Sequence, residues 1–96
     1  MVFQGILPAG SVVMLKEGNH RLMVTGYAQK LQGSEEVYDY VGCLWPEGFT
    51  APDQNIVFNQ DAVETVYFIG YQTDGQQVFA AKLQDALAEY RARQKE

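Results

Sequence analysis

Short apolar runs alternate with polar turns along residues 7–72, and the pattern changes to helical spacing after that. Runs rich in β-branched and aromatic residues, bounded by Gly, Pro, Asn or Ser, are typical of strands. Because these runs are short and closely spaced, they predict a small antiparallel β-sheet or a partly open barrel of about five strands. The expected strands lie at residues 11–15, 21–31, 37–45, 56–59 and 65–71.

Glycines mark special positions within this pattern. The Gly18-Asn19 pair between the first two runs favours a hairpin. Gly26 and Gly42 each lie inside a run, where a glycine indicates a bulge or the close approach of another backbone. The connection at residues 46–55 is the longest irregular one, and connections of that length are often functional or mobile.

A C-terminal amphipathic helix is predicted over residues 74–93. Asp74 followed by Gln77 fits a capping box, in which side chains bond the free backbone N–H groups of the first turn. Its apolar stripe must be buried and consists of Phe79, Leu83, Ala86, Leu87 and Tyr90. We expect the stripe to pack on the domain's own sheet, with docking on a partner helix or a second copy as the alternative.

These elements make one domain of the α+β class over residues 1–96, with a β-rich part at 7–72. An apolar fraction of 47% suffices for one core at this length. The net charge is −5, and no Lys or Arg occurs between Lys30 and Lys82. This argues against nucleic acid as a partner, because phosphate neutralisation needs clustered cations. The acidic interval indicates a solvated surface or the steering of a basic partner.

No apolar run approaches the roughly 18 residues needed to cross a bilayer. Residues 1–10 contain no Lys or Arg and no sustained apolar core, so they do not resemble a secretory signal. We therefore expect a cytoplasmic protein with no membrane span.

Few residues offer chemistry. His20 is the only histidine, and no other His or Cys lies at a metal-ligand spacing from it. Cys43 lies in an apolar run and is expected to be buried. The carboxylates of Asp39 and Glu47 flank an aromatic strand and are expected to be surface charges. We expect no enzyme, no catalytic residue, no metal and no cofactor; a small-ligand binder or enzyme that uses Cys43 or the two carboxylates is the alternative.

Aromatic residues are the remaining candidates for function. Tyr38 and Tyr40 share one face of their strand and Asp39 faces the other, and whether the tyrosine pair is core or surface stays open. Trp45 and Phe49 bracket a Pro-Glu-Gly turn, and turns lie at the surface. The predicted protein-binding surface consists of Tyr40, Trp45, Glu47 and Phe49.

Three segments together resemble a known group of proteins. They are Leu7 to Lys16, Tyr38 to Gly48 and Phe58 to Tyr71, and the middle one carries Tyr-Asp-Tyr, Gly-Cys and Pro-Glu-Gly in that order. The chain resembles, over about residues 7–90, a domain-of-unknown-function family of small proteins from Gram-positive bacteria. Members of that family are encoded at type VII secretion loci, often beside genes for LXG-type toxins.

The resemblance implies a non-enzymatic accessory, adaptor-like or chaperone-like, whose partner is an LXG-type toxin or a secretion component. Type VII substrates carry a C-terminal Tyr-x-x-x-Asp/Glu signal, whereas Tyr90 is followed four residues later by Gln94. The chain is therefore expected to be a helper that stays inside and not secreted cargo. The alternative is a homo-oligomeric structural or regulatory protein, such as a homodimer formed through the C-terminal helix.

Overall fold

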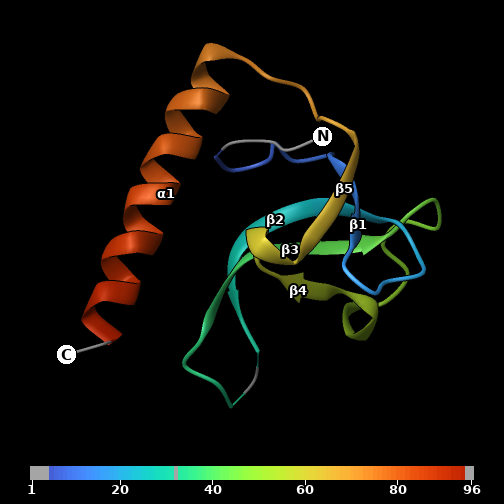
Figure 1. The fold of residues 1–96 in the computed structure, drawn as a ribbon, viewed down its shortest axis with the longest axis horizontal. Helices are drawn as coiled ribbons and strands as arrows, with labels where there is room; N and C mark the ends of the chain where they lie inside the picture. Colours follow the sequence, from blue (N-terminus) through green and yellow to red (C-terminus); the bar gives the residue numbers. More distant parts are fainter. Residues whose placement is uncertain (1–4, 32, 95–96) are drawn as a thin grey trace.

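The computed structural model describes residues 5–31 and 33–94. Figure 1 shows the strands gathered on one side of the molecule and a single long helix along the other. The strands are β1 (Val12–Leu15), β2 (Leu22–Lys30), β3 (Val37–Leu44), β4 (Ile56–Phe58) and β5 (Val63–Phe68). Helix α1 spans Asp74–Gln94, and the 3-10 turns η1 (Pro52–Gln54) and η2 (Gln60–Ala62) precede β4 and β5. The predicted α+β class, with an antiparallel sheet and a C-terminal helix, is confirmed.

The five strands form one open, antiparallel sheet in the order β4-β3-β2-β1-β5. In a flat sheet the two edge strands would lie about 19 Å apart, at about 4.8 Å for each step. Only residues 59–62 connect them, and most of this link is the compact turn η2. Because such a link cannot span that distance, the sheet must curl so that the end of β4 approaches the start of β5. The backbone N–H of Lys16 donates to the Ala62 carbonyl at 2.8 Å and fastens the curled end.

Both glycines inside the strands have the expected role. The pairing of β2 with β3 shifts between Val24 and Gly26, which is the predicted bulge. A Cβ placed on Gly42 would lie 2.6 Å from the Met23 carbonyl oxygen on the neighbouring strand, so only glycine fits there. These two positions allow β2 and β3 to bend without losing their pairing.

Tyr40 lies at the centre of the core and is fully buried. Its ring centroid is 5.9 Å from that of Tyr27 and 5.3 Å from that of Phe58. Its hydroxyl accepts a hydrogen bond from the Leu7 N–H at 2.9 Å and donates one to the Gln60 side chain. Burial raises the pKa of Tyr40 to about 12. Of the two possibilities for Tyr40, core or surface, the structure shows the core. The prediction that Tyr40 belongs to the protein-binding surface is therefore wrong.

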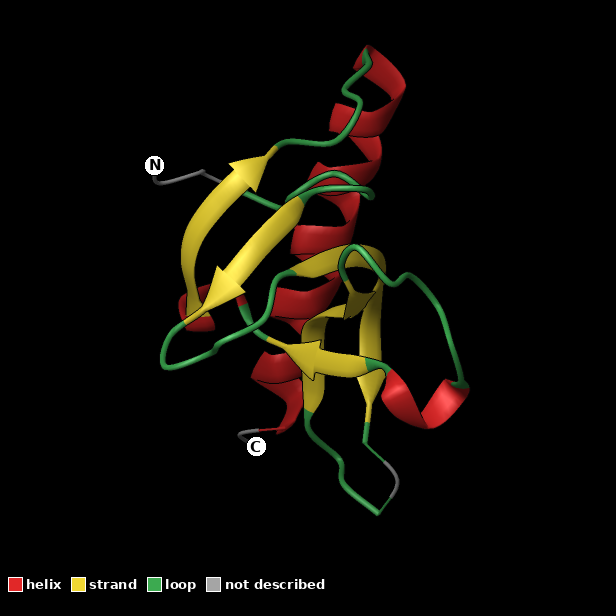
Figure 2. Ribbon diagram, turned by 90° about the vertical axis from the view of Figure 1, so that its right-hand side faces the viewer, coloured by secondary structure: helices red, strands yellow, loops and turns green. Residues whose placement is uncertain are grey.

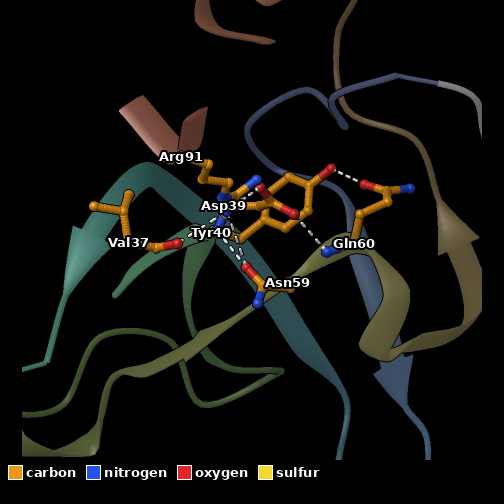
Figure 3. Close-up of polar contacts among 6 residues, drawn as sticks. All are labelled: Val37, Asp39, Tyr40, Asn59, Gln60 and Arg91. Atoms are coloured by element: carbon orange, nitrogen blue, oxygen red, sulfur yellow. Dashed lines mark hydrogen bonds and ion pairs between the residues drawn. The ribbon is translucent and has the colours of Figure 1, made fainter. Parts of the chain in front are cut away.

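Asp39 is also buried, at 7% exposure, although its carboxylate is expected to be a surface charge. Figure 3 shows the reason, which is a polar cluster that joins β3, η2 and α1. One carboxylate oxygen lies 2.9 Å from Nη2 of Arg91, and the other accepts from the Gln60 N–H at 2.8 Å. Arg91 also donates to the Val37 carbonyl at 2.9 Å. The carboxylate thus anchors the helix to the sheet.

Helix α1 packs on the domain's own strands and N-terminal segment, as expected. Leu87 is buried, Leu83 and Tyr90 are half-buried, and the Phe79 ring lies 5.7 Å from that of Tyr27. Ala86 is exposed, so the predicted stripe is only partly covered. The predicted cap is wrong by one residue: Oγ1 of Thr73, and not Asp74, accepts from the N–H of the third helical residue at 3.0 Å.

Ser11 holds the segment before β1 to the segment after β5. Its hydroxyl donates to the Pro8 carbonyl at 2.7 Å and accepts from the Gly70 N–H at 2.9 Å. A Cβ on Gly70 would lie 2.1 Å from the Ala9 carbonyl oxygen, so the two backbones touch at this point. This contact fixes how the chain leaves β5 toward α1.

Candidate functional site

An apolar groove crosses the face of the sheet formed by β1, β2 and β5. Its position follows from the register, because Val12 on β1 is opposite both Met23 on β2 and Phe68 on β5. Trp45 is one of its lining residues, and the Trp45 backbone N–H donates to the Arg21 carbonyl at 2.9 Å. The groove has a volume of about 440 Å³ and is lined by Gly10, Val12, Arg21, Met23, Trp45, Tyr67 and Phe68.

A bulge in β5 supplies the groove with two aromatic rings. Val13 pairs with Val66 but Val12 pairs with Phe68, so Tyr67 is an extra residue on β5. Strict alternation would put Val66 and Phe68 on the same face. With the bulge, Val66 is buried in the core, whereas Tyr67 and Phe68 both line the groove and are 47% and 60% exposed.

Arg21 is the single charged residue among those that line the groove. Its guanidinium carbon lies 4.4 Å from the centroid of the Tyr67 ring, which is a cation–π contact. Arg91, Arg93 and Lys30 all pair with carboxylates, but the guanidinium of Arg21 has no such partner within residues 5–31 and 33–94. The groove therefore combines apolar walls with one cation held in a fixed position.

The structure separates the four residues predicted to bind protein. Trp45 is 41% exposed and lines the groove, and Phe49 is 65% exposed on the adjoining connection. Glu47 lies in the turn between them, where its carboxylate is 2.9 Å from Nε2 of His20. That hydrogen bond lowers the pKa of Glu47. Tyr40 is in the core instead, as described above.

Sequence reasoning missed most of the groove. The pattern assigns Arg21 and Met23 only to the expected strand at residues 21–31, and Tyr67 and Phe68 only to the one at residues 65–71. Strand β5 contains no glycine or proline that would mark the bulge that turns both rings outward. A signal that could have been used is the adjacent Tyr67-Phe68 pair, because two neighbouring large rings cannot both enter a core on a regular strand.

The residues considered for chemistry have other partners. A cavity of about 300 Å³ lies beside Asp39, Gln60 and Arg91, but these groups are bonded to one another. Asp39 lies near the start of β3, and Glu47 lies beyond its last residue, Leu44. The five residue steps from Asp39 to Leu44 span about 16 Å, so the two carboxylates are at opposite ends of the strand. Cys43 is 2% exposed. Among the described side chains, no group of three or more His, Cys, Asp or Glu could hold a metal ion.

The fold and the groove define the class of this molecule: a small α+β domain with a curled, open five-stranded sheet, a C-terminal helix and an exposed aromatic groove. The family model described as Domain of unknown function (DUF4176) matches residues 6–79, and the chain belongs to that family. This match confirms that the chain belongs to a domain-of-unknown-function family, and the matched residues include every residue that lines the groove. No curated protein and no solved structure matches the chain. Within the described residues, no helix is long and apolar enough to span a membrane.

Proposed function

We propose that this protein is a non-enzymatic protein-binding accessory, adaptor-like or chaperone-like, and that the aromatic groove is its binding surface. The observation that carries the proposal is the exposure of Trp45, Tyr67 and Phe68 around one hollow beside Arg21. Tryptophan, tyrosine and arginine dominate the residues that contribute most to protein–protein binding. Contiguous apolar surface of this kind on a small domain is typical of an interaction site.

The resemblance to proteins encoded at type VII secretion loci supplies the class of partner. We propose that the accessory acts in the cytoplasm on an LXG-type toxin or on a component of the secretion machinery. The net charge of −5 supports such a role, because it steers a basic partner toward the domain.

A second candidate is a homo-oligomeric structural or regulatory protein that associates through α1. It is favoured by a second group of exposed apolar side chains near the start of the helix, since Tyr71, Val78 and Phe79 are all at least half exposed. Light scattering at increasing concentration tests this candidate: a strict monomer contradicts it, and a dimer lost in Phe79→Ala supports it.

The first proposal is tested by co-purification with toxins and secretion components encoded beside this chain. Tyr67→Ala should reduce the retained partner at least tenfold, because it removes a groove wall and the ring under Arg21. Tyr71→Ala is the matched control, since it removes an equally large exposed ring outside the groove. Circular dichroism checks that both variants fold. Equal retention by the two variants would contradict the assignment of the groove, and no retained partner at all would contradict the function.

A further inference from the structure

The groove lies beside an open sheet edge. The strand order ends at β5, whose one strand neighbour within the described chain is β1, and Figure 2 shows β5 along the margin of the sheet. An edge strand presents backbone N–H and C=O groups that another chain can pair with. Natural edges are usually protected by charges or proline, yet β5 has no proline and carries its one charge, Glu64, near its start.

The same strand forms a wall of the groove, because Tyr67 and Phe68 are the last two residues of β5. A strand added to this edge would run about 4.8 Å from β5. Every second side chain of that strand would then face the side of the sheet on which the groove lies. Backbone pairing and side-chain insertion are thus available to one extended ligand, which is the mode of strand addition.

The charge of the groove indicates which chemical group the ligand should carry. Arg21 is the one charged lining residue, and it has no carboxylate partner among the residues that the structure describes. Its guanidinium lies over the Tyr67 ring, and a guanidinium in such a contact can still donate its N–H groups to a ligand. The complementary group is a carboxylate next to the apolar side chain that fills the groove.

We propose that an extended segment of the partner protein adds to β5 as a further strand, places a bulky apolar side chain in the groove and pairs a neighbouring Asp or Glu with Arg21. This inference rests on the proposed protein-binding function and specifies its ligand. A second copy of the chain is a weaker occupant, because both copies carry a net charge of −5 and repel each other.

The test is the selection of displayed twelve-residue random peptides on the folded protein, followed by synthesis of the selected sequences. We expect aromatic and β-branched residues in alternation with one Asp or Glu at a fixed position. Replacing that acid by its amide should weaken binding about fivefold to the native protein and leave it unchanged for Arg21→Gln. Lys82→Gln is the matched control, because Lys82 is exposed on α1 outside the groove and should keep the fivefold difference.

Backbone methylation of the peptide tests strand addition directly. Alternate N–H groups of an added strand bond the sheet edge, so methylating one alternate set should abolish binding while methylating the other set should not. Equal effects of both sets, selection of amphipathic helical peptides or of no peptide, or a dimer that light scattering detects and Tyr67→Ala abolishes would each overturn the inference. If the full-length partner is still retained through Tyr67 in such a case, protein binding stands and only the strand-addition mode fails.

Discussion

Replacing Asp39 by Asn should loosen the helix from the sheet. The substitution keeps the shape of the side chain but removes the charge that faces Arg91 at 2.9 Å. The amide can still accept from the Gln60 N–H through its oxygen, but its NH₂ group then points at a guanidinium that is also a donor. The contacts of α1 with β3 and η2 weaken together, because Asp39 is the residue that connects them.

The loss of unfolding free energy expected for Asp39→Asn lies between two known limits. A hydrogen bond to a charged group contributes about 1.5–3 kcal/mol, whereas an exposed ion pair contributes at most about 1 kcal/mol. Asp39 is 7% exposed, but the side chain of Arg91 is 41% exposed, so solvent screens part of the pair. We expect Asp39→Asn to lower the free energy of unfolding by about 2 kcal/mol, which corresponds to a Tm decrease of about 10 °C for a domain of this size.

Urea unfolding followed by circular dichroism measures this loss, and a double-mutant cycle with Arg91→Met isolates the pair. Glu89→Gln is the matched control, because Glu89 pairs with Arg93 on the exposed side of α1. That control should change stability by less than about 0.5 kcal/mol. A loss for Asp39→Asn no larger than the control's would refute the anchoring role of Asp39.

Three further predictions follow from single contacts. Burial raises the pKa of Tyr40 to about 12, whereas the unfolded side chain titrates near 10. The buried neutral hydroxyl therefore contributes its full stabilisation below pH 10 and loses it as the pH rises to 12. Stability should therefore fall by about 2–3 kcal/mol as pH rises from 10 to 12, measured by urea unfolding, and a flat profile would contradict the burial of this ring. Gly70→Ala should destabilise by more than about 2 kcal/mol or prevent folding, since its Cβ would overlap a carbonyl oxygen, while Gly75→Ala at the helix start should be neutral or stabilising in thermal melts. Thr73→Ala should cost about 1 kcal/mol through loss of the helix cap, and an equal or larger loss in Asp74→Ala would restore the capping role to Asp74.

The order of elements could be predicted from the sequence because turn residues punctuate it. Gly18-Asn19, the polar stretch at 32–36 and the Pro-rich connection after Trp45 separate runs whose lengths match β1, β2 and β3 closely. The pattern predicts the fifth strand at residues 65–71, whereas β5 spans Val63–Phe68. Its predicted end was too late because Ile69 and Gly70 continue the apolar run, although the Gly70 N–H bonds Ser11 and not a neighbouring strand.

The burial of Asp39 and Tyr40 shows why buried polar groups are harder to predict from the sequence than the order of elements. Periodicity assigns faces of a strand, but it cannot say that a helix residue 52 positions later will supply a cation to the opposite face. The cluster in Figure 3 consists of residues from β3, η2 and α1, which lie together in the folded domain. Long-range contacts of this kind are properties of the tertiary fold and leave no local signal.

The groove depends on a still smaller feature, the one-residue irregularity at Tyr67. Without it, Phe68 would follow Val66 into the core, and the face around Trp45 and Arg21 would lose one of the two rings that β5 supplies. A regular strand buries more apolar surface, so the exposed pair opposes the tendency of the fold to cover its aromatics. An arrangement that leaves Tyr67 and Phe68 in water is understandable when another surface covers them during function. The bulge therefore links local backbone geometry to the proposed binding surface, which the Tyr67→Ala experiment tests.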